Sequence, residues 1–438
     1  HAFRIQTMKR LKSKLSGCLS LLACVALGQP SSASASEWVD PETPAGVLPY
    51  SGQSGWQLVF SDEFNGTTLD TGKWGVDIST RTRAPRTDRG IDQWYYAEEN
   101  VSLDGSGSLV LDVTKVGDST MHTGSISSDG IYEPKYGYLE ARIQIGDTNM
   151  DTHTAFWLQG SNMGNVDGTG NDGAEVDIFE SAWFGDYTKS VVHIDGYGAD
   201  KQASTKQYDA PGLHSGYNHF GLEWTPNSMK IYYNGVHKVT YTGIWVPQVP
   251  EWLWLSTGAS FGDIGTFATE PLGRLTSAKV DYVRVWQYDG NREPYFLSDP
   301  LGKPPATVGS AYSESVAGDA LDDDEGDSIT HSKVSSPAND WLTIGPDGSL
   351  SGTPSIENEG SNSWTLQASD CAGGSTTTTL EIVVNPVAGP MALVGGSLLN
   401  GDFNANPGDS VSFAETDHWY NTKGQQSQVA TLADKTYD

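Results

Sequence analysis

Short runs of alternating or uniformly apolar residues recur along the first two thirds of the chain. They appear roughly every 8 to 15 residues between Glu37 and about Tyr288, separated by clusters of Gly, Asn and Asp. Examples are residues 56–60, 108–113, 138–145, 230–233 and 279–286. Successive side chains of a strand point to opposite faces. This spacing, without long 3.6-residue periods, predicts an all-β domain of antiparallel strands in a sandwich or jelly roll over residues 36–290.

A second region follows residues 291–305, where Pro300, Pro304 and Pro305 mark a linker. Residues 306–386 alternate again at 364–366 and 376–384, which predicts a small immunoglobulin-like β-sandwich. Residues 350–354, after 341–344, resemble the immunoglobulin or cadherin-like modules of secreted bacterial proteins. The acidic loop 321–327 suits Ca²⁺, which prefers clustered carboxylates, although a solvated acidic turn is the expected role.

The residue patterns at the two ends of the chain differ from those of the two predicted domains. Residues 1–35 have the order of a signal peptide, with basic residues after Met8, an apolar stretch 19–27 and a small-residue site ending at Ala35. Residues 1–7 look like an upstream extension. Residues 387–438 resemble the incomplete start of a carbohydrate-binding module, too short to fold alone.

Charge and cysteine content narrow the class of protein. The chain has 26 basic and 55 acidic residues and a net charge of −29, which argues against nucleic acid as a partner. Only Cys371 lies outside the leader, so no disulfide framework is expected. No segment after the leader has the roughly 20 apolar residues that a membrane span needs. We therefore expect a secreted, extracellular monomer with no membrane association.

Three carboxylates stand close together in the otherwise apolar stretch 173–183. Buried charge is costly unless it is paired, so Glu175, Asp177 and Glu180 call for a function. On a regular strand Glu175 and Asp177 share a face and Glu180 points away. A β-bulge between Asp177 and Glu180 would return Glu180 to that face and place all three in one cleft.

Paired carboxyl groups about 5 to 5.5 Å apart are the arrangement of retaining glycoside hydrolysis. Mutual repulsion would keep one of them protonated, as a general acid requires. For the motif alone, a solvent-facing acidic edge strand is an equal alternative. Aromatic and polar residues near the motif, Trp157, Trp183 and His193, favour a saccharide cleft.

Six ordered motifs between Trp56 and Gln287 resemble glycoside hydrolase family 16, a family of secreted endo-acting enzymes on a curved β-jelly roll. Besides the acidic motif, they are residues 60–64, 99–101, 136–142, 221–226 and 280–285. The resemblance makes Glu175 the nucleophile, Glu180 the acid/base and Asp177 an assisting carboxylate.

The resemblance also implies a set of substrate-binding residues, which are Trp157, Trp183, His193, Trp94 and Asn100. It implies no cofactor for the chemistry. A structural Ca²⁺ is often held on the convex face in this family, with Glu63 and Asp281 as candidate ligands here, although both could simply form strand-end hydrogen bonds.

The expected substrate is a β-1,3-linked or mixed-linkage β-glucan, because residues 92–101 look most like the laminarinase-like branch. Residues 193–198 and 247–251 depart from that branch, which keeps β-galactan hydrolysis, of the agarase, carrageenase or galactanase type, open. Four arginines at positions 81, 83, 86 and 89 could grip sulfate or uronate groups, but a solvated loop is the expected role. Transglycosylation and a non-catalytic polysaccharide-binding protein are the remaining alternatives.

Overall fold

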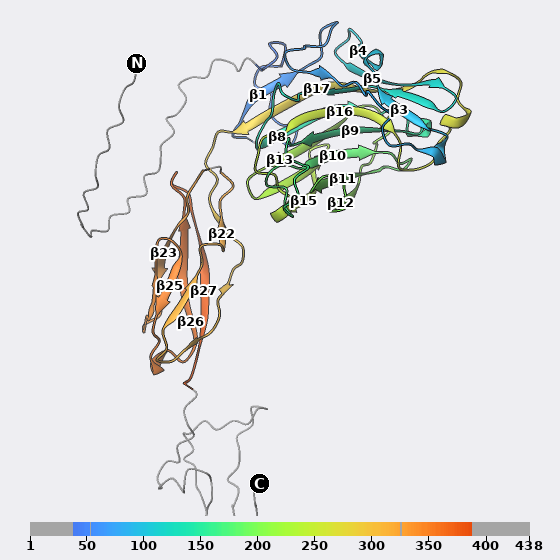
Figure 1. Ribbon diagram of the computed structural model, residues 1–438. Helices are drawn as coiled ribbons and strands as arrows, with labels where there is room; N and C mark the ends of the chain where they lie inside the picture. Colours follow the sequence, from blue (N-terminus) through green and yellow to red (C-terminus); the bar gives the residue numbers. More distant parts are fainter. Residues whose placement is uncertain (1–37, 53, 325, 388–438) are drawn as a thin grey trace, which may run out of the picture. The chain divides into compact units, whose positions relative to one another are not determined.

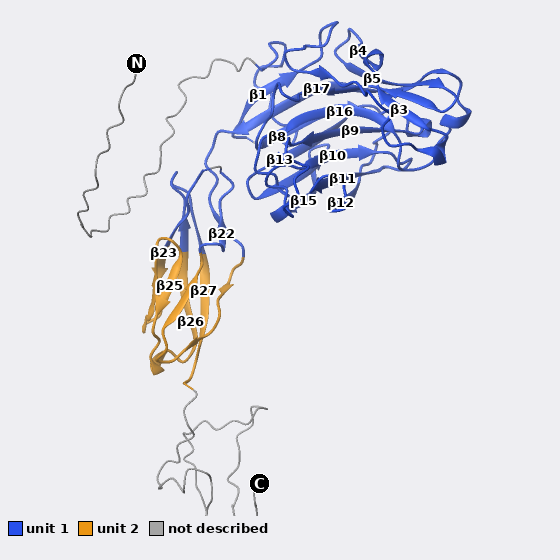
Figure 2. Cartoon of the chain, viewed as in Figure 1, with its two compact units in different colours: residues 1–297, 317–331, 367–377 blue, residues 298–316, 332–366, 378–438 orange. Residues whose placement is uncertain are grey.

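The computed structural model describes residues 38–52, 54–324 and 326–387. The predicted signal peptide and the predicted module start from residue 388 onward lie outside the described residues. The described residues fall into two compact units (Figure 2), one formed by those of 38–297, 317–331 and 367–377 and the other by those of 298–316, 332–366 and 378–387. This division differs from the predicted boundaries, because two segments of the predicted second domain group with the first.

Two large sheets of mainly antiparallel strands form most of the first unit (Figure 1), which confirms the predicted all-β sandwich. The ten-stranded sheet has the order β15-β14-β13-β8-β17-β5-β6-β3, with β1 paired to β17 and β4 to β5. Its strands are β1 Trp56–Asp62, β3 Gln93–Tyr96, β4 Val101–Leu103, β5 Leu109–Gly117, β6 Thr120–Thr123, β8 Gly137–Gln144, β13 Asn218–Trp224, β14 Ser228–Tyr233, β15 Val236–Thr242 and β17 Gly273–Tyr288.

The seven-stranded sheet carries the acidic motif and has the order β12-β11-β10-β9-β16-β7-β2. Its strands are β2 Gly75–Val76, β7 Ser125–Ser127, β9 Thr152–Gln159, β10 Glu175–Ser181, β11 Tyr187–Ile194, β12 Gln202–Asp209 and β16 Trp252–Ala259.

Apolar side chains between the two sheets form the core. Val176, Ile178 and Phe179 of β10 are fully buried in it. Phe179 stacks on Phe220 of β13 with ring centroids 3.6 Å apart. Burial of such side chains stabilises a fold by about 1.5–3 kcal/mol each. This packing fixes one face of β10 and leaves its other face to the cleft.

The remaining strands form three smaller sheets, with orders β18-β22, β19-β27-β26-β23 (β20 pairs with β27) and β21-β25-β24. They are β18 Tyr295–Phe296, β19 Leu301–Gly302, β20 Ala306–Thr307, β21 Tyr312–Ser315, β22 Ala320–Leu321, β23 Thr330–Ser335, β24 Leu342–Ile344, β25 Ser349–Gly352, β26 Gly360–Ser369 and β27 Ser375–Asn385. Strict alternation of buried and exposed residues along β27 agrees with the predicted second β-sandwich.

Helical structure among the described residues is limited to single turns of 3-10 helix. They are η1 Thr87–Arg89, η2 Glu98–Asn100, η3 Thr148–Met150, η4 Gly243–Trp245, η5 Phe267–Thr269 and η6 Ile356–Asn358. Within the part of the chain that the structure describes, we find no helix with the length and apolar character needed to cross a membrane.

Candidate active site

Strand β10 contains the predicted β-bulge. Its pairing with β9 runs from Glu175 opposite Gln159 to Asp177 opposite Trp157, and the register then shifts before Glu180 pairs with Ala155. The pairing with β11 also shifts after Asp177, between that residue and Glu180. The extra residue returns Glu180 to the face that carries Glu175 and Asp177.

The start of β10 is held by a close approach of two glycines. A Cβ atom on Gly160 would lie 2.7 Å from Cα of Gly173, and Gly173 has a φ of +134°. Next to them, the fully buried Glu251 accepts a hydrogen bond at 2.7 Å from the backbone N–H of Ala174. These contacts fix the backbone directly before Glu175.

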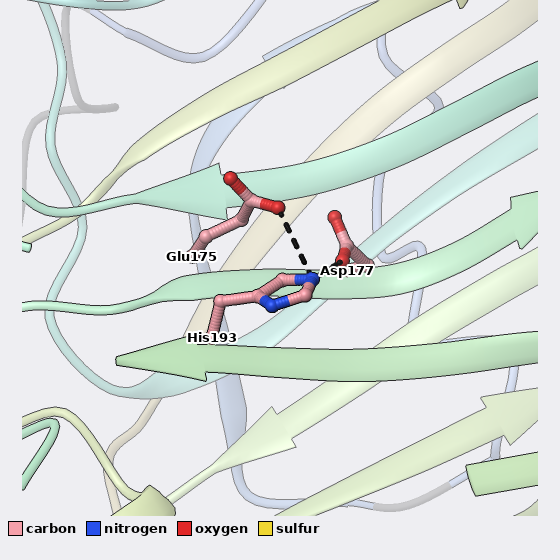
Figure 3. Close-up of side chains that lie close together, drawn as sticks. All are labelled: Glu175, Asp177 and His193. Carbon is pink, nitrogen blue, oxygen red and sulfur yellow. Dashed lines mark ion pairs between the residues drawn. The ribbon is translucent and has the colours of Figure 1, made fainter. Parts of the chain in front are cut away.

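All three carboxyl groups line one cleft with a volume of about 1330 Å³. Four of the five predicted substrate-binding residues, Trp94, Trp157, Trp183 and His193, line the same cleft. Figure 3 shows the side chains of Glu175 and Asp177, on β10, directed toward His193 on the neighbouring β11.

Burial and mutual repulsion separate the titrations of the three carboxyl groups. Burial and then the charge of Glu175 raise the pKa of Glu180 to about 8. Burial and the charges of Glu180 and Glu175 raise the pKa of Asp177 well above its usual range.

Burial also raises the pKa of Glu175, but a hydrogen bond from Tyr197 and the charges of Lys201 and Arg83 oppose that rise. Glu175 is therefore the carboxyl group whose ionised form has the most support, because a hydrogen bond to a carboxylate favours its charged form.

His193 lies between two of the carboxyl groups. Its Nε2 atom is 3.5 Å from Oε1 of Glu175 and 3.7 Å from Oδ2 of Asp177. Both separations would be ion pairs if the imidazole were charged, but burial lowers the pKa of His193 to about 4. Near neutral pH the ring is therefore neutral and adds no charge to the site.

The tryptophans of the cleft are held rigidly. Trp157 stacks on Trp254 with ring centroids 4.0 Å apart and planes 10° from parallel, and its indole N–H donates to Ser256. Trp183 carries the ammonium group of Lys189 at 4.0 Å from its ring centroid. The indole N–H of Trp94 donates to the backbone carbonyl of Ala84 at 2.6 Å. Such fixed aromatic faces suit the C–H faces of sugar rings.

Three predicted residues lie outside the cleft. The amide of Asn100 is buried and donates to the carbonyl groups of Asp112 and His122 and to the hydroxyl of Thr114, which ties strands of the ten-stranded sheet together. The structure therefore does not bring Asn100 to the substrate side.

The other two are the candidate calcium ligands. Both oxygens of Glu63 accept hydrogen bonds from Arg284, at 2.9 and 2.8 Å. Asp281 pairs with Arg142 at 2.6 Å. Because an arginine neutralises each carboxylate, this donor set does not fit a Ca²⁺ ion, and both residues act in ion pairs between strands.

Two other groups gather potential metal-ligand atoms within 4.8 Å among the described residues. One is Glu175, Asp177 and His193, and the other is Asp322, Asp324 and Asp327 of the acidic loop. Arg292 already pairs with Asp324 at 2.7 Å. Calcium binding by the loop therefore stays a prediction.

The structure adds cleft residues that the sequence analysis did not single out. Tyr197, in the loop after β11, donates a hydrogen bond to Glu175. Lys189 lies directly opposite Glu180 on β11, and Trp254 stacks under Trp157. The alternation Trp252-Leu253-Trp254 was a readable signal for a tryptophan-bearing face, and the atypical segment 193–198 contained Tyr197.

The arginine-rich loop reaches the cleft. Arg81, Arg83 and Arg86 line it, and Arg81 and Arg83 are exposed, as a solvated loop predicts. Arg89 is buried and pairs with Asp88 and Asp151.

Two parts of the chain match models of known protein families. Residues 91–260 match the family model "Glycosyl hydrolases family 16", and residues 294–385 match "Putative Ig domain". Among curated proteins, the chain is 26% identical to a keratan-sulfate endo-1,4-beta-galactosidase of Sphingobacterium multivorum, over 53% of this chain and 55% of that protein. It is 25% identical to glucan endo-1,3-beta-glucosidase A1 of Niallia circulans, over 55% of this chain and 36% of that protein.

Among solved structures, the laminarinase from Flavobacterium sp. UMI-01 matches with a TM-score of 0.43 and 22% identity, over 53% of this chain and 100% of that one. The chain spans about half or less of the length of the two curated relatives. The match to the glycosyl hydrolase family 16 model is confined to residues 91–260, which include the acidic motif of β10 and most of the cleft residues.

Proposed function

We propose that the chain is a retaining glycoside hydrolase that cleaves a β-linked polysaccharide within the polymer. The observation that carries this proposal is the bulge in β10, which brings Glu175, Asp177 and Glu180 to one cleft between fixed tryptophan faces. A purely binding protein has no need of three titrating carboxyl groups in its cleft. The names of both curated relatives, a β-galactosidase and a β-glucosidase that act internally, support the same reaction class.

In the proposed mechanism Glu175 is the nucleophile. Its carboxylate attacks the anomeric carbon, and the bond between that carbon and the leaving oxygen breaks. Tyr197 supports the ionised form of Glu175 before attack. The product of this step is a covalent glycosyl ester on Glu175.

Glu180 gives its proton to the leaving oxygen in the first step. Its raised pKa of about 8 keeps it protonated at neutral pH, as a general acid requires. Ionised after that transfer, it then takes a proton from the water that hydrolyses the ester. Asp177 is buried and lies between the two in sequence, and burial with the charges of Glu180 and Glu175 raises its pKa well above the usual range, so its protonated form can donate a hydrogen bond to the nucleophile.

The cleft supports the class of reaction more directly than the identity of the polysaccharide. A β-1,3-linked or mixed-linkage β-glucan and a β-galactan are the two classes that we consider, and one curated relative is named for each class. Since a polysaccharide of this kind is met outside cells, we also propose that the protein is secreted. We also propose that the protein acts as a monomer. We do not propose a structural calcium at Glu63 and Asp281.

Hydrolysis of laminarin, lichenan, agarose and carrageenan by the full chain tests this proposal. We expect release of oligosaccharides of several lengths from one class, with the anomeric configuration of the new reducing ends retained when followed by NMR. Inversion at the new reducing end would contradict the mechanism. Inactivity on all β-linked polymers would contradict the function.

A further inference from the structure

Five basic side chains line the cleft around the three carboxyl groups. Arg81, Arg83 and Arg86 come from the loop between β2 and β3, while Lys189 lies on β11 and Lys201 directly precedes β12. In the order of the seven-stranded sheet, β2 and β11 lie on opposite sides of β10. The cations therefore approach the carboxyl groups from two sides, in a protein whose net charge is −29.

These five side chains form no ion pair with a carboxylate of residues 38–387, as far as these are described. Basic residues elsewhere do, as Arg142 does with Asp281 and Arg284 with Glu63. The two other acidic residues of the cleft have different partners. Asp77 accepts hydrogen bonds from Ser125 and Ser127, and Asp263 accepts one from the backbone N–H of Phe184.

Arg83 and Lys189 are positioned by aromatic rings and not by carboxylates. The guanidinium group of Arg83 lies over the ring of Tyr96 at 4.3 Å and over that of Trp94 at 5.1 Å. The Nε atom of Arg86 is buried and has no hydrogen-bond partner among the described residues. Lys189 is fixed over Trp183. Guanidinium groups offer a rigid fork of donors that matches the oxygens of sulfate and carboxylate.

The carboxyl groups of the catalytic motif carry less negative charge than their number suggests. Burial and repulsion raise the pKa of Glu180 to about 8 and the pKa of Asp177 well above its usual range, which disfavours the ionised forms of both. The acidic surface elsewhere is screened over a Debye length of about 8 Å at physiological ionic strength. The charge available to a ligand inside the cleft therefore comes largely from the basic side chains that line it.

We propose that the cleft binds a polysaccharide that carries anionic substituents, sulfate esters or carboxylates, with Arg83 and Arg86 on one side and Lys189 and Lys201 on the other as the anion-binding groups. This inference rests on the proposed function, because it assumes that the polysaccharide occupies this cleft. A sulfate or carboxylate group of the polymer could form charge-assisted hydrogen bonds with these cations, whereas a neutral sugar offers only hydroxyl groups. The sugars flanking the cleaved bond are thus selected by charge as well as by shape.

Binding to the Glu175→Gln variant of the full chain tests this inference separately from hydrolysis. Isothermal titration compares carrageenan as the sulfated polymer, the same polymer after chemical desulfation, alginate as a polyuronate and laminarin as a neutral glucan. We expect at least one anionic polymer to bind about tenfold or more tightly than the neutral ones. This ratio of dissociation constants corresponds to the low end of the free energy that one hydrogen bond to a charged group contributes. Preference for carrageenan identifies sulfate, and preference for alginate identifies carboxylate.

A second substitution added to the Glu175→Gln variant tests which basic side chains bind the anionic group of the polymer. Arg86→Gln and Lys189→Gln should each remove most of the preference, and Arg86→Lys should keep part of it. Arg274→Gln, an exposed arginine outside the cleft, should leave it unchanged. Equal binding of charged and neutral polymers, or an equal loss in the Arg274→Gln and Arg86→Gln variants, would overturn the inference. Neither result would touch the hydrolysis assay, which tests the reaction itself.

Discussion

The hydroxyl group of Tyr197 donates a hydrogen bond to Oε2 of Glu175. This bond favours the ionised carboxylate and so lowers the pKa of Glu175 against the effect of burial. In the Tyr197→Phe variant the pKa of Glu175 should rise. Since the nucleophile must be ionised, we expect the acidic limb of the pH profile of kcat/KM to move to higher pH.

The matched control for Tyr197→Phe is Tyr50→Phe, which removes the hydroxyl of an exposed tyrosine stacked on His219 outside the cleft. That variant should leave the acidic limb where it is in the wild type. An acidic limb that does not move in Tyr197→Phe would show that the hydrogen bond has no influence on the nucleophile.

Glu180 gives the pH profile its basic limb. Because burial and the charge of Glu175 raise its pKa to about 8, the general acid loses its proton as the pH rises through that value, and kcat/KM should fall. Glu180→Gln should lower kcat/KM on the polysaccharide by about 10²–10⁴-fold and remove this limb. An aryl glycoside with a good leaving group needs no such proton, so its cleavage should suffer less; an equal loss on both substrates would argue against the acid role.

The carboxyl group of Glu251 fixes the backbone before Glu175, and its contribution to the free energy of unfolding should depend on pH. Burial raises its pKa well above the usual 4.5, so the folded protein keeps a proton that the unfolded chain releases above that pH. The free energy of unfolding should therefore fall as the pH rises. Glu251→Gln keeps the acceptor for Ala174 and cannot titrate, so its decline should be smaller.

Urea unfolding at pH values between about 5 and about 8 measures this effect. The exposed Glu42→Gln serves as the control and should follow the wild type. If the Glu251→Gln protein loses stability with pH as steeply as the wild type, the carboxyl group of Glu251 does not carry the effect.

The Glu63–Arg284 pair should contribute to stability and not to catalysis. Both side chains are nearly buried and share two hydrogen bonds. Arg284→Met leaves the Glu63 carboxylate buried without its partner, which costs about 3–5 kcal/mol when a buried pair is broken. Urea unfolding should show this loss, and the double variant with Glu63→Gln should recover part of it. A loss below about 1 kcal/mol, the range of exposed pairs, would mean that the carboxylate finds solvent or another partner.

The sequence was sufficient to predict the fold class and the local geometry of β10. The spacing of Glu175, Asp177 and Glu180 requires a bulge if all three are to share a face, and the registers of β9 and β11 contain that bulge. Alternation along a strand is a local property, and it decides which side chains face the core.

Contacts made by loops could not be predicted in the same way. The path of the loop from β2 to β3, which brings Arg83 and Arg86 to the cleft, depends on backbone pairing with distant residues, such as Arg83 with Trp94. Asn100 was predicted near the substrate from a sequence motif, but it lies outside the cleft. Its amide instead donates hydrogen bonds to carbonyl groups of neighbouring strands.

The most direct test of the account compares hydrolysis and binding in the Glu175→Gln variant, on the polysaccharide that the wild type cleaves best. If Glu175 is the nucleophile, kcat should fall on the order of 10⁴-fold or more, as for loss of a catalytic nucleophile. The dissociation constant for the polymer should change little. Substantial residual hydrolysis by this variant, with binding intact, would contradict the assignment of Glu175 as nucleophile.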